Sequence, residues 1–141
     1  MRELKVKVKT AKGRKISSTR WLARQLNDPY VKEAKQKGYR SRSAFKLIEI
    51  DNKFDVFKAG QKILDLGCSP GGWCQVAAER VNSSPSNVLV HGIDMKDCDP
   101  ISGVNIQNLD FLNEESFHQF TQNIEEKFDV ILSDMAPNAI G

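Results

Sequence analysis

The sequence predicts an α/β fold built on a parallel β-sheet, and two features of the chain lead to this expectation. The first is the segment 62–73, KILDLGCSPGGW, in which a short apolar run ends in an acid and a glycine-rich turn follows. The second is that later apolar runs, ending at Asp94 and Asp134, alternate with segments of helical periodicity. Short buried strands that alternate with helices are typical of parallel sheets.

The segment 62–73 is the centre of the predicted fold. Its strand delivers Asp65 to a turn at Gly67, and the apolar spacing after the turn predicts a helix over 72–81. Strand, glycine turn and helix form the opening unit of nucleotide-type cofactor sites. Gly71 and Gly72 lack a Cβ and would let a ligand approach the backbone. The alternative is that these glycines only make a sharp connection.

Three further strands and a second core helix follow from the same periodicities. We expect a second strand over 88–94, a weak third strand running from 104 to Asp110 and Phe111, a helix capped by Asn113, and a fourth strand over 128–134. Asp65, Asp94 and Asp134 then end three strands. Because the carboxyl ends of parallel strands meet at one edge, these acids are expected in one crevice.

Charge divides the chain into a basic first part and an acidic second part. Residues 1–46 hold 15 Lys and Arg against 3 acids, and residues 47–141 hold 6 against 15. A basic segment joined to an acidic body suggests a polyanion-binding arm on a separate chemical domain. We therefore divide the chain into a basic flexible arm (1–17), a helical segment facing RNA (18–60) and a core (61–141). The alternative is a basic tail that serves solubility only.

The basic part is predicted to be helical after its arm. One helix begins near Ser18, a second has Asp28 as N-cap and ends at Gly38, and a third is capped by Ser43. Their outward cations, among them Arg40 and Arg42, surround aromatic side chains, as suits unpaired RNA. The inner faces are expected to hold Tyr30, Val31 and Ala34 in the second helix, and Ala44, Leu47, Ile48 and Phe54 in the third.

Composition and length exclude several classes of protein. At 141 residues the chain fits one domain, and no apolar run approaches the roughly 18 residues of a membrane span. Three cysteines without a CxxC pattern support neither a disulfide framework nor a metal site. We expect a reduced, cytoplasmic location, although the basic N-terminus leaves organelle targeting open.

The glycine turn indicates the kind of cofactor. The pattern GxGxxG of dinucleotide sites is absent, and no Lys-Ser/Thr pair follows the glycines, which excludes a P-loop. Acids at successive strand ends would repel a phosphate, but they suit a ribose, an ammonium group and a sulfonium cation. These groups describe S-adenosylmethionine, and a nicotinamide cofactor remains the second candidate.

Five segments in order give the chain a family resemblance. The chain resembles the FtsJ/RrmJ family of RNA ribose 2′-O-methyltransferases in the segments GYRSRSAFKL, DLGCSPGGW, GIDM, LDF and SDMAPN. The resemblance runs from about residue 17 to the last residue. It implies a Rossmann-like methyltransferase fold and S-adenosylmethionine as methyl donor. It also implies a ribose in large-subunit ribosomal RNA, expected to be a uridine, as acceptor.

The resemblance also assigns roles to residues. Lys46 and Asp134 match the first two members of the family's Lys-Asp-Lys-Glu catalytic set, whereas helical periodicity alone makes Lys46 a solvated lysine. Asp94 would hold the ribose of the cofactor and Asp110 its adenine side. The cofactor-binding set implied by the resemblance is Asp65, Gly67, Pro70, Gly71, Gly72, Trp73, Asp94, Met95, Asp110, Phe111 and Asp134.

The chain departs from the family pattern in two places. Cys68 and Ser69 stand where alanine is usual, a change that a small-residue turn accommodates. The family's second lysine, its glutamate and three of its strands have no counterpart before residue 141. We therefore expect the N-terminal half of a methyltransferase domain, with the fourth strand as an apolar edge and little or no turnover by itself. The alternative function is a module that binds RNA or cofactor without turnover.

Overall fold

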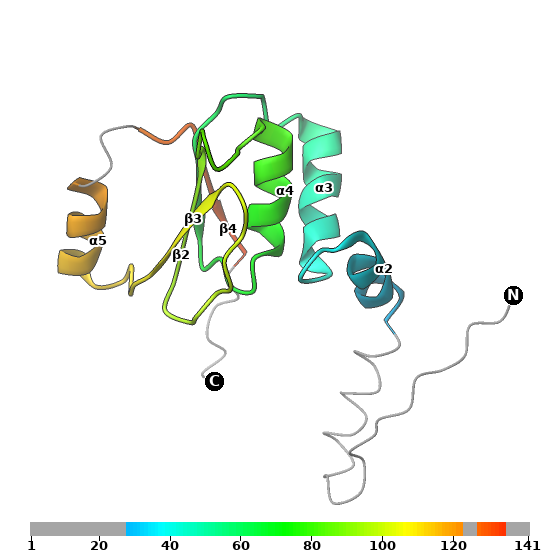
Figure 1. The fold of residues 1–141 in the computed structure, drawn as a ribbon, viewed down its shortest axis with the longest axis horizontal. Coiled ribbons are helices and arrows are strands. Elements are labelled where there is room, and N and C mark those ends of the chain that lie inside the picture. The colour runs from blue at the N-terminus through cyan, green and yellow to red at the C-terminus, as the bar shows by residue number, and fades with distance from the viewer. Residues whose placement is uncertain (1–27, 123–126, 135–141) are drawn as a thin grey trace, which may run out of the picture.

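The computed structural model describes residues 28–122 and 127–134. Its centre is a parallel sheet of four strands in the order β3-β2-β1-β4 (Figure 1), which confirms the predicted α/β class. The predicted arm 1–17 and the predicted helix near Ser18 lie outside the described residues. The described elements are α2 (Pro29–Lys37), α3 (Ser43–Phe54), β1 (Ile63–Leu66), α4 (Gly72–Val81), β2 (Val90–Asp94), β3 (Val104–Asn108), α5 (Glu114–Gln122) and β4 (Val130–Ser133).

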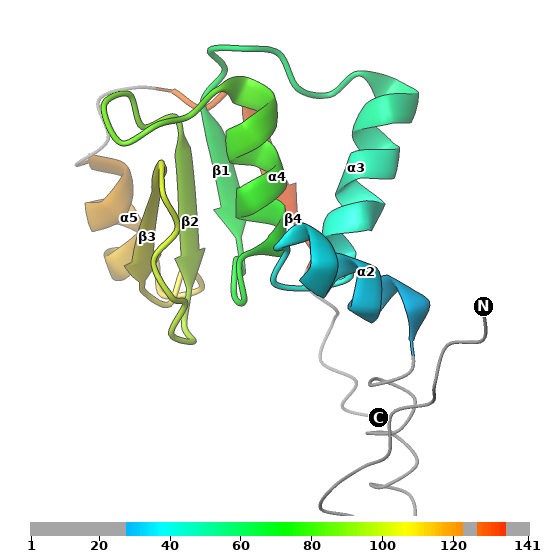
Figure 2. The same cartoon turned by 45° about the vertical axis from the view of Figure 1, so that its right-hand side comes forward.

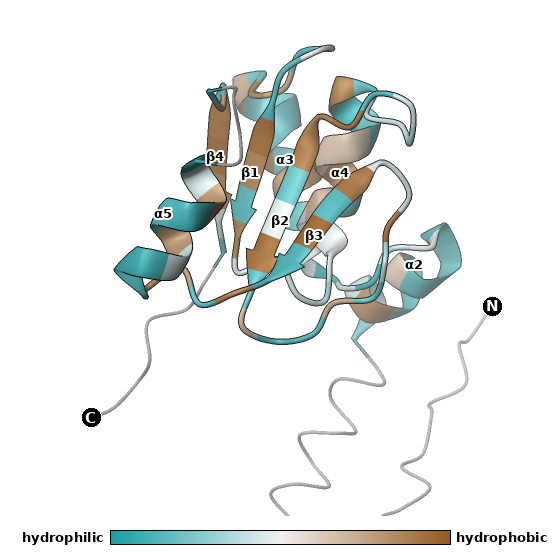
Figure 3. Ribbon diagram, turned by 60° about the vertical axis from the view of Figure 1, so that its left-hand side comes forward, coloured by the Kyte–Doolittle hydropathy of each residue, from teal (hydrophilic) through white to brown (hydrophobic). Residues whose placement is uncertain are grey.

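The sheet lies between two layers of helix. Helix α4 lies against one face with α3 packed on its outer side, and α5 lies on the opposite face (Figures 1 and 3). The two faces bury separate apolar clusters, centred on Val76 and Ile63 on the α4 side and on Leu64 and Ile93 on the α5 side. Burial on both faces explains why the central strand β1 is a short apolar run rather than an alternating pattern.

The register brings the strand ends to one edge. Asp65 of β1 lies opposite Gly92 of β2 and Leu132 of β4. Figure 2 shows the strand arrows pointing to the same end of the molecule, where α2 also lies. No helix among residues 28–122 and 127–134 is long and apolar enough to cross a membrane.

The predicted caps of α2 and α5 are confirmed. Asp28 accepts hydrogen bonds from the amides of Tyr30 and Val31, and Gly38 ends α2 with a φ of +81°. Asn113 accepts a hydrogen bond from the amide of Ser116 in the first turn of α5. Side-chain capping of these orphan amides is the local reason that the two helices begin where they do.

Ser43 is not a helix cap. It is the first residue of α3, and its hydroxyl lies 2.7 Å from the hydroxyl of Ser41 instead of contacting a helical amide. The prediction was wrong because these two serines bond to each other on the side that faces the sheet's carboxyl edge.

Phe54 does not belong to the inner face of α3, because its side chain is 66% exposed. The chain turns at Asp55, which has a φ of +52°, and Phe57 then enters the core in its place. Tyr30 of α2, also predicted to face inward, is 49% exposed.

Two strands differ from their predicted extents. β2 begins at Val90, and Val88 before it is exposed. β4 begins at Val130 and pairs with β1. In the part of the chain that the structure describes, β4 is an edge of the sheet, and Ile131 on it is exposed.

Candidate functional site

A pocket of about 160 Å³ lies at the carboxyl ends of β1 and β4, beside the glycine turn. It occupies the point where the strand order reverses, since β2 follows β1 on one side and β4 pairs with it on the other. Open α/β sheets bind their ligands at such a point. The lining residues are Ser41, Ser43, Asp65, Gly67, Cys68, Ser69, Pro70, Gly72, Trp73 and Asp134.

Backbone hydrogen bonds to β2 fix the glycine turn. The amides of Gly67 and Cys68 both donate to the carbonyl of Ile93, at 2.8 and 3.1 Å. The amide of Ser69 donates to Asp94 at 2.8 Å, and the other oxygen of that carboxylate accepts from the amide of Lys96 at 2.8 Å. The Asp94 carboxylate therefore stabilises the conformation of the turn. Each of its oxygens keeps a lone pair for a further donor.

The space beside two glycines is filled by the chain itself. A Cβ at Gly71 would lie 2.6 Å from the Cδ1 atom of Ile101, and one at Gly72 would meet the hydroxyl of Ser41. Gly71 also has a φ of +118° at the N-terminus of α4. The room expected there for a ligand is thus taken by neighbouring segments, although Gly72 still lines the pocket.

Arg40 joins three segments around the turn. Its guanidinium donates to the carbonyl of Pro70 at 3.2 Å, and to those of Asp99 and Pro100 at 2.5 and 2.6 Å. Its own amide donates to Gln75 of α4 at 2.8 Å. Arg40 is therefore bound within the molecule, and its assignment to an outward cationic surface was wrong.

Asp65 is buried at the base of the pocket with an exposure of 2%. Cys74 of α4 donates its thiol to this carboxylate at 3.3 Å. Burial, aided by the nearby charges of Asp134 and Asp94 and opposed by the Cys74 hydrogen bond, raises the pKa of Asp65 to about 7. A half-protonated buried acid favours a cationic neighbour, because a positive charge stabilises its ionised form.

Lys46 and Asp134 meet at the mouth of the pocket. The Lys46 Nζ lies 3.1 Å from an Asp134 Oδ1, although the residues are 88 positions apart in sequence. The indole nitrogen of Trp73 donates to the carbonyl of Ser43 at 2.8 Å, which ties α3 to α4 beside this pair. The Lys46 Nζ also lies 6.0 Å from the centre of the Trp73 ring.

The remaining predicted residues lie outside the pocket. Met95 follows Asp94 and is 61% exposed, and Asp110 accepts a hydrogen bond from the amide of Leu112. Phe111 packs against the apolar cluster on the α5 face. Their cofactor-binding roles stay predictions.

Sequence reasoning missed the contribution of Ser41 and Ser43 to the pocket. Both belong to the segment GYRSRSAFKL, which carried the resemblance but was interpreted as a basic surface. The periodicity of this segment does not indicate that it folds over the glycine turn. The hydrogen bond from Arg40 to Pro70 shows that it does, although the two residues are 30 positions apart in sequence. Within residues 28–122 and 127–134, no cluster of His, Cys, Asp and Glu could hold a metal ion.

Comparison with known proteins identifies the family. The model of the FtsJ-like methyltransferase family matches residues 39–141. Two relatives named Ribosomal RNA large subunit methyltransferase E, from Cereibacter sphaeroides and from the Wolbachia of Brugia malayi, are 51% and 54% identical to the chain. The alignments cover 99% and 100% of this chain, and 59% and 62% of those proteins.

A solved structure agrees with these relatives. A crystal structure of a ribosomal RNA methyltransferase from Plasmodium falciparum matches with a TM-score of 0.58 and 40% identity, over 73% of this chain and 59% of that chain. The chain belongs to the FtsJ-like methyltransferase family and has its Rossmann-like methyltransferase fold. The predicted resemblance is confirmed, and the family implies a methyl-donor cofactor. The chain spans about three fifths of the length of its curated relatives.

The raised pKa of Asp65 predicts a pH dependence of stability. An aspartate has a pKa near 3.9 in the unfolded chain, so between about pH 4 and pH 7 the folded state binds more protons. The contribution of Asp65 to the free energy of unfolding therefore falls as pH rises through this range. Relative to Asp65→Asn, the wild type is expected to lose about 2 kcal/mol of stability between pH 5 and pH 8.

Urea unfolding of both proteins at several pH values measures this difference. Asp99→Asn, at an exposed position outside the pocket, is the control variant, and its curve should run parallel to that of the wild type. A constant difference between wild type and Asp65→Asn would show that Asp65 is ionised throughout.

Proposed function

We propose that this chain carries the donor pocket and the first two catalytic residues of an S-adenosylmethionine-dependent RNA ribose 2′-O-methyltransferase. The observation that carries the proposal is the contact of Lys46 with Asp134 beside the pocket at the reversal of strand order. This contact places a cation, which can stabilise an oxygen nucleophile, beside a pocket whose acids suit a cationic methyl donor. The acceptor that we propose is a ribose, a uridine in particular, of large-subunit ribosomal RNA.

The acids of the site fit S-adenosylmethionine rather than a phosphate-bearing cofactor. Asp65 lies in the pocket wall, Asp134 at its mouth, and Asp94 next to the turn that forms it. Three carboxylates at the strand ends oppose a pyrophosphate and favour the ammonium and sulfonium groups of this donor. The lone pairs left on Asp94 suit the hydroxyls of a ribose. Asp110, Phe111 and Met95 are proposed for the adenine side.

Lys46 and Asp134 serve the acceptor oxygen in this proposal. When bound, S-adenosylmethionine supplies an electrophilic methyl group. The Lys46 ammonium, held by Asp134, orients the ribose hydroxyl and stabilises the negative charge that develops on its oxygen. Most of the rate enhancement then comes from positioning the two reactants. Both side chains are partly exposed, as a site for a large RNA requires.

Two observations support ribosomal RNA as the partner. The first part of the chain is strongly basic, which favours a polyanion. The relatives described above carry ribosomal RNA in their names. A ribosomal substrate agrees with a cytoplasmic location, which we also propose.

Calorimetric titration of the chain tests the cofactor assignment. S-adenosylmethionine and S-adenosylhomocysteine are expected to bind, and NAD is expected not to bind, because the acids repel its pyrophosphate. Lys46→Met should retain the wild-type affinity for S-adenosylmethionine, since Lys46 serves the acceptor. Binding of NAD alone would contradict the proposal, as would a folded chain that binds neither cofactor.

Transfer of tritiated methyl groups to purified large ribosomal subunits tests the reaction. The chain by itself is expected to show little or no transfer, and any methyl groups that it does transfer should lie on ribose 2′-oxygens, which makes the adjacent RNA linkages resistant to alkali. Lys46→Met should abolish the transfer. Methyl groups on bases, or transfer that survives Lys46→Met, would contradict the assigned chemistry.

The contacts of Arg40 predict a second effect on cofactor affinity. Arg40→Lys is expected to weaken S-adenosylmethionine binding about tenfold, because one ammonium cannot reach carbonyls on separate segments as a guanidinium fork does. Arg42→Lys is the matched control, since the guanidinium of Arg42 pairs with Asp28 instead of with the carbonyls that Arg40 joins. Equal affinities of the two variants would show that Arg40 does not position the pocket.

A further inference from the structure

A second open groove of about 340 Å³ lies between α2 and the first turns of α3. Lys46 lines it and also contacts Asp134, so the groove adjoins the proposed reaction centre. Its lining residues are Tyr30, Arg42, Ser43, Phe45, Lys46 and Glu49. The groove has two aromatic rings and two cations against one acid, whereas the donor pocket is lined by two acids and no cation, so the two sites suit different ligands.

Two aromatic rings, Tyr30 and Phe45, form one wall of the groove, and the ring of Tyr39 packs against Phe45. The ring centre of Phe45 lies 6.2 Å from that of Tyr30 and 5.8 Å from that of Tyr39, the latter pair edge to face. The hydroxyl of Tyr39 donates to Glu79 of α4 at 3.0 Å, and burial together with this bond raises the pKa of Tyr39. The wall is therefore fixed to the body at Tyr39, and its outer member, Tyr30, is half exposed.

Cations surround this wall. The guanidinium of Arg42 lies 5.7 Å from the centre of the Tyr30 ring, where an ion pair with Asp28 holds it. The Lys37 ammonium lies 5.4 Å from the centre of the Phe45 ring and 2.9 Å from Glu33. The facing acids are Asp28, Glu33 and Glu49, yet residues 28–46 hold six Lys and Arg against two acids. The surface therefore favours an anion that carries a flat ring.

We propose that this groove binds an unpaired nucleobase of the acceptor RNA, stacked on Tyr30, with the adjoining phosphates beside Arg42 and Lys37. The inference rests on the proposed function and names the subsite that presents RNA to Lys46. Aromatic rings flanked by cations are how proteins hold unpaired RNA, because every base has a flat face and every linkage a charge. The base stacks at one end of the groove, and its strand reaches Lys46 at the other.

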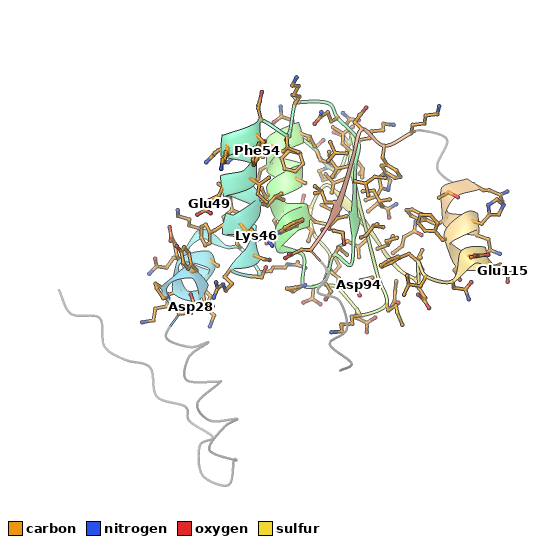
Figure 4. All side chains as sticks on the ribbon, turned by 180° about the vertical axis from the view of Figure 1, so that it is seen from behind. Asp28, Lys46, Glu49, Phe54, Asp94 and Glu115 are labelled. Atoms are coloured by element: carbon orange, nitrogen blue, oxygen red, sulfur yellow. The ribbon has the colours of Figure 1, made fainter. Side chains whose placement is uncertain are left out.

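Helix α3 supplies an internal comparison. Phe54, near the end of α3 opposite Lys46 (Figure 4), is exposed and has the Lys53 ammonium 5.3 Å from its ring centre. It resembles Tyr30 in exposure and in its cation. It does not line the groove, and it lies away from Lys46. Phe54→Ala is therefore a matched control for Tyr30→Ala.

Fluorescence anisotropy with two labelled probes tests the proposal without cofactor or turnover. One probe is a single-stranded uridine oligoribonucleotide, and the other has the same length with abasic riboses. Tyr30→Ala is expected to weaken binding of the first probe about fivefold to a hundredfold, the range that stacking of one base supplies. It should leave the abasic probe unchanged, because the phosphates still meet their cations. Tyr30→Phe and Phe54→Ala should bind both probes as the wild type does.

Each other outcome overturns the proposal. Equal loss on both probes would assign Tyr30 to the fold or to phosphate binding, and no loss on either probe would remove it from the RNA surface. Absence of RNA binding by the wild type would likewise reject the groove. Tyr30→Leu, which keeps apolar bulk without a ring, should repeat the loss if Tyr30→Ala does not fold. Because S-adenosylmethionine binding is measured separately, failure of this subsite and failure of the proposed function remain distinguishable.

Discussion

The contacts of the Arg40 guanidinium hold together the parts from which the site is built. They join the link between α2 and α3 to the glycine turn after β1 and to the loop after β2. Lys46 lies at the end of the first turn of α3, directly after this link, so its position over the pocket depends on these bonds. A guanidinium can satisfy several carbonyls from one planar fork, which a flexible ammonium cannot. The close packing of these segments also requires glycine at positions 71 and 72. A side chain at Gly71 would collide with Ile101, and one at Gly72 would collide with Ser41.

The two sites beside Lys46 have opposite electrostatic character. On the pocket side, buried Asp65 keeps a raised pKa and favours a cation. On the groove side, Arg42 and Lys37 flank aromatic rings and favour an anion. Lys46 and Asp134 form an ion pair between them. A cationic methyl donor and an anionic RNA strand would thus approach the same ammonium group from different sides, which is the arrangement that a transfer between them needs.

Much of the sheet was predictable, because strand ends follow from local patterns. Asp65, Asp94 and Asp134 end apolar runs, and parallel pairing brings such ends to one edge. The orientation of α3 was not predictable from periodicity. The periodicity identifies the helix face that packs in the core, but it does not show what the other faces contact. Lys46 therefore looked solvated until the family resemblance assigned it a partner, and Arg40 looked like an outward cation. The prediction that Phe54 faces the core was wrong for a related reason, because the turn at Asp55 brings Phe57 into the core instead.

The central claim is that the glycine turn and the strand ends beside it form the methyl-donor pocket. Amide NMR spectra of the chain, recorded during titration with S-adenosylmethionine, test it at the level of residues. The account predicts that shifts concentrate on the amides of residues 67–69 and 71–73 and on those of Asp94 and Asp134, with α5 unaffected. Shifts confined to α5 or to the β3 edge, or a spectrum unchanged at saturating cofactor, would contradict it.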